Sequence, residues 1–151
     1  MVHLRIVDLV SCDHYEAVKT LRGNKYVLVF TEHASKAVRL FAVPDTSAAT
    51  AVLCLNAVFR SWGVPLKLLC DHGTAFVSEL FTLFCKRVGV KQIYSTVGNP
   101  QSNGATERFN RVIREYIAKV TDAGFNWDLK LENLEFEDKL EVQRIFLKSN
   151  G

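Results

Sequence analysis

Apolar residues in the first third of the chain form three runs that are typical of β-strands. Val2–Val10 is dense in Val, Leu and Ile, with Asp8 as its only acid, which indicates a strand buried on both faces. Ser11–Leu21 is polar and predicts no regular element. Lys25–Thr31 and Ala37–Val43 follow turn residues and predict two more strands. The three runs together predict an antiparallel meander.

The second part of the chain alternates helical stripes with short strand patterns. Asp45 or Thr46 can cap the first of these helices, and Gly63 ends it. In the region from Ala105 to Val120 the apolar residues recur at spacings of 3, 1, 3, 1 and 3, which is an amphipathic helix. The expected elements are helix Ala48–Trp62, strand Pro65–Cys70, helix Phe76–Val88, strand Val90–Tyr94, helix Ala105–Val120 and helix Trp127–Phe146. The fold class is therefore α/β: one domain with a mixed sheet of five strands, three antiparallel and then two parallel, and helices on both faces.

Composition supports a folded domain but does not identify a partner. The 151 residues are 48% hydrophobic and 23% charged, and the net charge of +3 is too small to establish nucleic-acid binding. The cysteines are scattered without a C-x-x-C pair, so we expect reduced thiols in an intracellular protein and no zinc site. No apolar run approaches the roughly 18 residues of a membrane span, so no membrane partner is expected.

Three acids are candidates for a site that cuts phosphodiesters. Two divalent ions can activate an attacking oxygen and stabilise a leaving one, and Mg²⁺ prefers carboxylate ligands from separate elements. Asp8 lies inside an apolar strand pattern, where an unpaired acid is costly. Asp71 ends a strand and Glu107 begins a helix, and adjacent parallel strands would bring Asp8 close to Asp71. Taken singly, Asp71 could be a turn residue, and Glu107 could serve the helix dipole.

Polar residues next to Glu107 fit a DNA-binding surface. Asn110, Arg111 and Arg114 follow at +3, +4 and +7, so they share its helix face opposite the apolar stripe. Cations beside an acidic site suit a phosphate backbone, although a solvated face with intrahelical ion pairs explains the same pattern. The segment from Gly98 to Gly104 before this helix is rich in turn residues and predicts a mobile loop.

These motifs resemble the catalytic core of retroviral and gypsy-type retrotransposon integrases. The matching stretches are Val7–Val10, Arg22–Val29, Leu69–Phe76 and Asn99–Arg111, of which the last, with its Pro-Gln-Ser-Asn-Gly loop, is the most specific. The family has thirty-five residues between its second Asp and its Glu. The same interval separates Asp71 from Glu107, since 107 − 71 = 36.

The resemblance implies an RNase H-like fold and a metal-dependent polynucleotidyl transferase. Water would attack near the 3′ end of element DNA, and the freed 3′-hydroxyl would then attack target DNA. It also implies two Mg²⁺ or Mn²⁺ ions, a homodimer or higher oligomer, and action in the nucleus. The residues it carries over are Asp8, Asp71 and Glu107 as catalytic metal ligands, Gln101, Ser102 and Asn103 as the active-site loop, and Asn110, Arg111 and Arg114 as DNA contacts.

The sequence departs from the family pattern in two places. Ser11–Val18 replaces the usual Gly-Pro-Leu-Pro, which allows Asp13 to compete with Asp8; Asp8 is favoured because it lies in the strand pattern. The likeness covers residues 4–136, and the chain leaves the pattern at Glu137, without the closing helix, the N-terminal zinc module or the C-terminal DNA-binding domain. An inactive or domesticated descendant that binds DNA or protein is the alternative, and a cellular ribonuclease is a weaker third.

Overall fold

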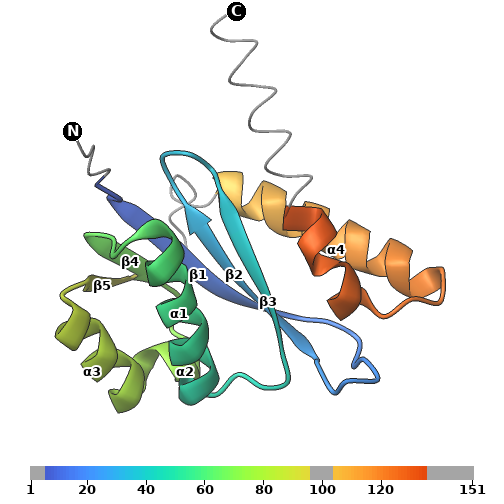
Figure 1. Cartoon of the computed structure of the whole chain (residues 1–151), viewed down its shortest axis with the longest axis horizontal. Helices are drawn as coiled ribbons and strands as arrows, with labels where there is room; N and C mark the ends of the chain where they lie inside the picture. The colour runs from blue at the N-terminus through green and yellow to red at the C-terminus, as the bar shows by residue number, and fades with distance from the viewer. Residues whose placement is uncertain (1–5, 96–103, 136–151) are drawn as a thin grey trace, which may run out of the picture.

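A single five-stranded sheet organises the chain in the computed structural model, which describes residues 6–95 and 104–135, with the backbone alone for 104–110. The strand order is β3-β2-β1-β4-β5. β1 pairs antiparallel with β2 and β2 with β3, whereas β1–β4 and β4–β5 are parallel, which confirms the predicted mixed sheet (Figure 1). The strands are β1 (Leu9–Glu16), β2 (Tyr26–Glu32), β3 (Val38–Val43), β4 (Lys67–Cys70) and β5 (Lys91–Tyr94).

The first strand lies later in the chain than its apolar pattern predicts. The prediction placed it at Val2–Val10, but β1 runs through Leu9–Glu16, most of which was expected to be irregular. The polar residues of this strand are held by pairing, since every residue from Val10 to Glu16 has a register partner on β2. The prediction was wrong because ladder pairing with a strongly apolar neighbour outweighs the polar composition of β1.

The predicted helices need two corrections, and the last of them, Trp127–Phe146, begins as a 3-10 helix and is described only as far as residue 135. α1 (Ala48–Trp62) has the predicted bounds, but its N-cap is Ser47, whose hydroxyl accepts from the Thr50 amide, rather than Asp45 or Thr46. The expected helix Phe76–Val88 is two helices, α2 and α3, because Ser78 is extended and caps the second through the Phe81 amide. The remaining elements are α2 (Thr74–Val77), α3 (Glu79–Val88), α4 (Gly104–Asp122), η2 (Trp127–Lys130) and a helical stretch at 131–135.

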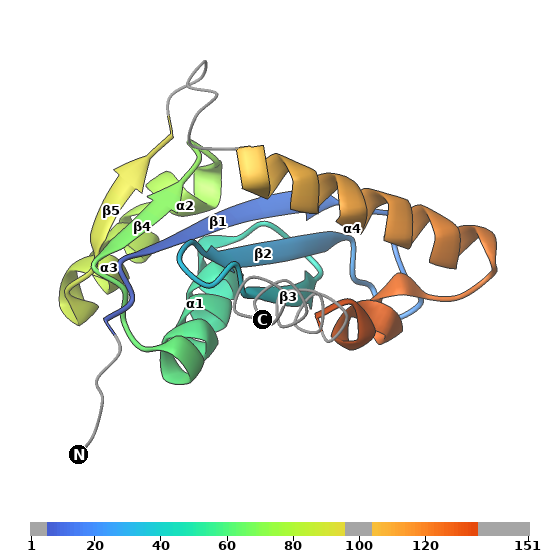
Figure 2. The same ribbon diagram turned by 90° about the horizontal axis from the view of Figure 1, so that it is seen from above.

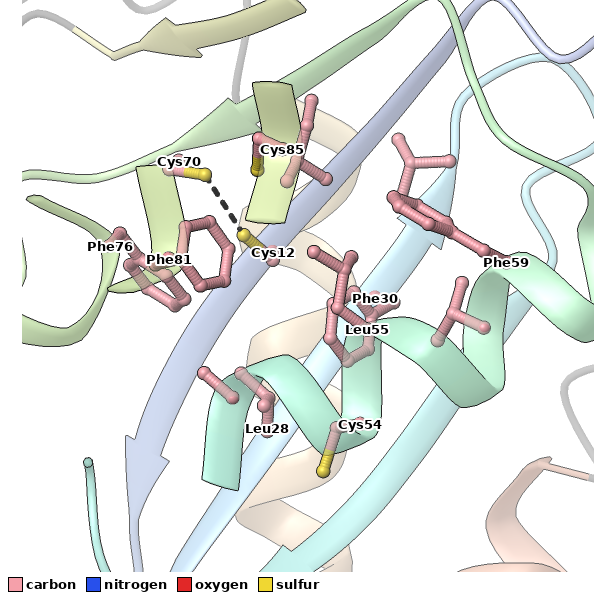
Figure 3. Close-up of a cluster of buried hydrophobic side chains, with 14 of the residues drawn as sticks. Cys12, Leu28, Phe30, Cys54, Leu55, Phe59, Cys70, Phe76, Phe81 and Cys85 are labelled. Carbon is pink, nitrogen blue, oxygen red and sulfur yellow. Dashed lines mark hydrogen bonds between the residues drawn. The ribbon is translucent and has the colours of Figure 1, made fainter. Parts of the chain in front are cut away.

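Alternation along β2 divides the core between the two faces of the sheet. Leu28 and Phe30 pack with α1, α2 and α3 on one face (Figure 3), and Val27 and Val29 pack with α4 on the other. Figure 2 shows the three shorter helices on one side of the sheet and α4 on the opposite side. Helices therefore cover both faces, as predicted. No helix in the described part of the chain has the length and apolar character needed to cross a membrane.

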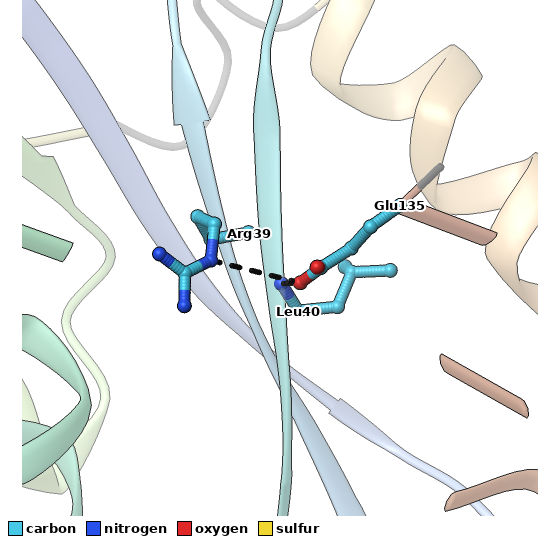
Figure 4. A network of polar contacts seen from close by, with 3 residues as sticks. All are labelled: Arg39, Leu40 and Glu135. Carbon is cyan, nitrogen blue, oxygen red and sulfur yellow. Dashed lines mark hydrogen bonds and ion pairs between the residues drawn. The ribbon is translucent and has the colours of Figure 1, made fainter. Parts of the chain in front are cut away.

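The segment after α4 is held against the first half of the chain. Trp127 is buried, and its indole Nε1 donates to the Val18 carbonyl at 2.5 Å. Glu135 lies beside the edge strand β3, where its carboxylate accepts from the Leu40 amide at 2.5 Å and lies 3.8 Å from Arg39 Nε (Figure 4). Two contacts distant in sequence thus fix the position of α4 over the sheet.

Candidate active site

Two aspartates lie side by side where β4 ends next to the middle of β1. The strands are parallel neighbours and Cys12 is in register with Cys70, so the next residue on each chain is Asp13 and Asp71. Val10 and Cys12 point into the core under α1 and α3, while Tyr15 packs under α4, so alternation directs Asp13 to the α4 face. Both aspartates are half-buried.

Asp8 does not lie near this pair, and the expectation that parallel strands would bring it to Asp71 is wrong. Asp8 is exposed and precedes β1, and its carbonyl accepts from the amide of Lys67, the first residue of β4. Asp71 follows the last residue of the same strand. Asp71 is four residue steps beyond Lys67, about 13 Å at the usual rise per residue of a strand. The alternative residue, Asp13, is the one that meets Asp71.

A tight turn holds the carboxylate of Asp71. Its Oδ1 accepts the amide hydrogen of Gly73 at 2.7 Å, which closes the turn from β4 into α2. A Cβ atom at position 73 would lie 2.8 Å from the same oxygen, so a side chain there would displace the carboxylate. Gly73 has φ −58° and ψ 149°, a conformation open to any residue, so the carboxylate rather than the backbone requires glycine.

The third predicted acid lies on α4. Glu107 is the fourth residue of this helix, and its side chain lies outside the described part of the structure. Figure 2 shows α4 running along β1, with its first turn at the end of the molecule where β4 and β5 finish. The start of α4 therefore lies at the end of the sheet where Asp71 follows β4, and the role of Glu107 stays a prediction.

The predicted DNA contacts divide into residues that the structure describes and residues that it does not. Arg111 and Arg114 are exposed on α4, and the Arg114 guanidinium lies 5.6 Å from the centroid of the Tyr15 ring. Tyr15 is two residues beyond Asp13 on β1, so Arg114 brings positive charge to the same face of the sheet. The loop residues Gln101, Ser102 and Asn103 lie outside the described residues, as does the side chain of Asn110.

Neutral groups lie beneath the two aspartates. Cys12 and Cys70 are buried with their sulfur atoms 3.2 Å apart (Figure 3). Burial, contact with Cys70 and the nearby charges of Asp71 and Asp13 raise the pKa of the Cys12 thiol well above its usual value. His14 stacks on Phe76 at 5.0 Å, and burial lowers its pKa although Asp71 and Asp45 oppose this. At neutral pH the Cys12 thiol and the His14 imidazole beneath the aspartates are therefore uncharged.

Paired carboxylates on neighbouring strands suit a hard divalent cation. Such ions take oxygen ligands and keep several waters, so two or three carboxylates suffice. Asp71 presents a carboxylate fixed in one orientation, and Asp13 lies at the same level on the next strand. Among the side chains that the structure describes, no cluster of three or more His, Cys, Asp or Glu residues could hold a metal. Glu107, whose side chain lies outside the described part of the structure, stays the predicted third ligand.

The sequence reasoning missed two features beside Asp71. The first is the contact between Gly73 and the Asp71 carboxylate, because the sequence pattern indicates only a turn at Gly73. The second is a stacked ring pair, in which the His72 and Tyr94 centroids lie 5.1 Å apart with their planes at 21°. The length of the second strand could have indicated Asp13. The run Tyr26–Glu32 needs an antiparallel partner of similar length, and a partner that starts at Leu9 extends beyond residue 13.

Comparison with known sequences connects this geometry to a family. Residues 7–100 match the family described as "Integrase core domain". The chain is 34% identical over 110 residues to the Pol polyprotein of Radiation murine leukemia virus (strain Kaplan), covering 72% of the chain. It is 33% identical over 99 residues to the uncharacterized protein K02A2.6 of Caenorhabditis elegans, covering 66%. The matches span only 19% and 8% of those relatives, respectively.

Comparison with solved structures supports the same fold. The catalytic core domain of BIV integrase superposes with a TM-score of 0.69 at 24% identity, over 83% of this chain and 79% of that one. A chain from the simian T-cell lymphotropic virus intasome in complex with PP2A regulatory subunit B56 gamma gives a TM-score of 0.70 at 20% identity, over 90% and 49% respectively. The five-stranded mixed sheet with helices on both faces is thus the RNase H-like fold of integrase catalytic cores.

Proposed function

The chain belongs to the integrase core domain family, and from that premise we propose that it is a metal-dependent enzyme that cuts DNA near a 3′ end and joins that end to a second DNA. The family makes polynucleotidyl transfer the general class of activity. The particular reaction, its metal ions and its residues are the proposal. Asp13, Asp71 and Glu107 are the proposed catalytic residues, and Asp13 takes the place first given to Asp8.

One observation carries this assignment: the parallel register that sets Asp13 beside Asp71. Two half-buried carboxylates on adjacent strands repel one another, and a cation between them relieves that repulsion. Asp71 cannot easily turn away, because the Gly73 amide holds its Oδ1. In the layer beneath, the Cys12 thiol and the His14 imidazole are both neutral at pH 7.

The proposed roles follow from where each group lies. Asp13, Asp71 and Glu107 would hold two Mg²⁺ or Mn²⁺ ions, which when bound activate the attacking oxygen and stabilise the leaving one. Arg111 and Arg114 neutralise phosphates of the bound strand and fix its position along α4. Water is the first nucleophile and the freed 3′-hydroxyl the second. The loop residues Gln101, Ser102 and Asn103, with Asn110, are proposed to contact the DNA end.

The acting unit that we propose is an oligomer of this chain on DNA. One structural relative was solved as part of an intasome, and on that analogy element ends and target DNA are the partners. The match covers only a small part of the curated relatives, so the reaction of a whole polyprotein is not assigned to this domain.

A three-variant comparison tests the proposal. Asp13→Asn and Asp71→Asn should each reduce Mn²⁺-dependent cleavage of branched DNA by roughly a hundredfold or more, since each removes a metal ligand. Asp8→Asn removes the same charge from an exposed position about five strand residues away and should retain activity. Calorimetric titration with Mn²⁺ should show weaker binding for the first two variants alone.

Two results would overturn the assignment. Loss of activity in Asp8→Asn with retention in Asp13→Asn would restore the first choice of ligand and contradict the register argument. Absence of Mn²⁺ binding by the unaltered chain at millimolar concentration would favour the inactive descendant, whose surface binds DNA or protein without cutting. Far-UV circular dichroism of each variant shows that folding is retained.

A further inference from the structure

A stacked pair of rings joins the ends of β4 and β5 beside the candidate active site. His72 directly follows Asp71, and Tyr94 is the last residue of β5. Their ring centroids are 5.1 Å apart and the planes are 21° from parallel, so the imidazole lies face to face on the phenol ring. Consecutive Cα atoms are about 3.8 Å apart, which keeps the pair within one nucleotide's reach of a phosphate held at Asp71.

Hydrogen bonds fix the Tyr94 ring of this pair. The Tyr94 hydroxyl donates to the Phe76 carbonyl at 3.2 Å, and Gln92 Nε2 donates to the same oxygen at 2.6 Å. Phe76 itself is fully buried under α3, so this carbonyl is part of the rigid core. Tyr94 therefore cannot rotate freely, and it gives the imidazole of His72 a fixed surface on which to stack.

The His72 side of the pair is open to solvent. Tyr94 is half-buried, whereas His72 is exposed. Because Tyr94 covers one face of the imidazole, the exposed surface of His72 lies on the rest of the ring. A fixed aromatic ring with an open face is the arrangement with which proteins bind bases of single-stranded nucleic acid, since every base has a flat π-face.

We propose that the open face of His72 stacks on an unpaired DNA base next to the phosphate held at Asp71. This rests on the proposed function, because it takes the ligand to be DNA, and it adds a subsite for the base beside the cutting position. Stacking accepts any base, so the subsite would select unpaired over paired nucleotides rather than one sequence over another. Tyr94 acts through His72 and is a positioning residue.

Fluorescence of 2-aminopurine tests the subsite directly, because stacking on an aromatic ring quenches it. The probe is a duplex with a short unpaired overhang that carries 2-aminopurine, bound to the full chain in the presence of Ca²⁺ as an oxygen-liganded divalent ion. The unaltered chain and His72→Phe should quench the probe, and His72→Ala should leave it bright and weaken binding of the overhang duplex by about tenfold. Leu83→Ala, at an exposed site on α3, is the matched control and should quench normally.

The outcomes separate this inference from the proposed function. Equal quenching by His72→Ala and the unaltered chain overturns the subsite, as does failure of His72→Phe to quench, which would indicate a polar contact instead. A paired 2-aminopurine that is quenched as strongly as the unpaired one also overturns it. Metal-dependent cleavage is measured separately on the same proteins. Cleavage without His72-dependent quenching refutes the subsite alone, and quenching without cleavage refutes the proposed reaction alone.

Discussion

Gly73 shows how the absence of a side chain can set the direction of a carboxylate. Its amide donates to Asp71 Oδ1, and its α-hydrogen faces the space into which a Cβ would bring a contact of 2.8 Å. Because the backbone at Gly73 is ordinary, replacement by alanine strains the Asp71 side chain and leaves the chain path unchanged. With Asp71 as the proposed metal ligand, Gly73 should therefore affect metal affinity more than stability.

Gly73→Ala should accordingly weaken Mn²⁺ binding by roughly tenfold, the size of effect seen when groups that orient a ligand are altered. The free energy of unfolding should change by less than about 1 kcal/mol, since alanine also restricts the unfolded chain. Calorimetric titration and urea unfolding measure the two quantities. Thr74→Ala, in the same turn, is the control and should change neither. An unaltered Mn²⁺ affinity in Gly73→Ala would refute this role.

The three aspartates show which parts of the candidate site the sequence predicts and which it does not. Asp71 was found correctly at a strand end, because the turn residues His72 and Gly73 follow it. Apolar composition favours Asp8 over Asp13, because it predicts the first strand at Val2–Val10. Composition does not report register, and a shift of five residues moves a side chain about 16 Å along a strand. Only pairing with β2 and β4 decides which acid reaches the site.

At the scale of elements, the loop between β1 and β2 is held to η2 by polar contacts. Thr20 Oγ1 and Asn24 Nδ2 both donate to Asp128 Oδ2, at 2.7 and 2.9 Å. The Leu21 amide donates to Asn126 Oδ1 at 3.1 Å. Partial burial raises the pKa of Asp128, but the hydrogen bonds from Asn24 and Thr20 outweigh it, so the net direction is downward. The ionised carboxylate therefore stabilises this junction.

The pH dependence of stability should reveal this contact. A lowered pKa in the folded state means that the contribution is present above the ordinary value of about 4 and is lost as the pH falls through the folded value. Asp128→Asn should be less stable than the unaltered chain at pH 7, and the difference should shrink towards pH 3. Urea unfolding across this range measures it, with Asp122→Asn as the control for removing one negative charge. A difference that is independent of pH would contradict the prediction.

Elements differed in how well their sequence predicted them. α1 was predicted to the residue, because an apolar stripe, a polar cap region and Gly63 all agree on its limits. The sequence does not predict the break between α2 and α3, because apolar residues at helical spacing stand on both sides of Ser78. Only the hydrogen bond from the Phe81 amide to the Ser78 hydroxyl shows that a new helix begins there. The tether to η2 joins residues more than a hundred positions apart, and no local pattern reports such a contact.

At the scale of the whole molecule, the sheet is one layer shared by two cores. Neighbouring residues of β2 enter opposite clusters, Leu28 with α1 and Val29 with α4. Unfolding of either layer would expose apolar side chains from the same strand. We therefore expect the described domain to unfold in one cooperative transition, as small single domains usually do.

Each core contains a tryptophan that can report on it. Trp62 packs against the cluster under α1, and Trp127 is buried in the cluster under α4. In Trp62→Phe and Trp127→Phe the remaining indole reports on one face alone. For each variant the fluorescence transition in urea should coincide with the transition measured by far-UV circular dichroism. A fluorescence midpoint for Trp127 well below the circular dichroism midpoint would show that α4 separates first.

Glu135 has a consequence for how copies of the protein meet one another in solution. β3 is an edge strand, and an outward amide on such a strand is an open template for a strand from another molecule. The Glu135 carboxylate accepts the hydrogen of the Leu40 amide and forms an ion pair with Arg39 on that edge, while β5 at the opposite edge is only four residues long. The sheet is thereby protected against growth by edge-to-edge association, so concentrated solutions should resist β-aggregation for as long as this one side chain stays in place.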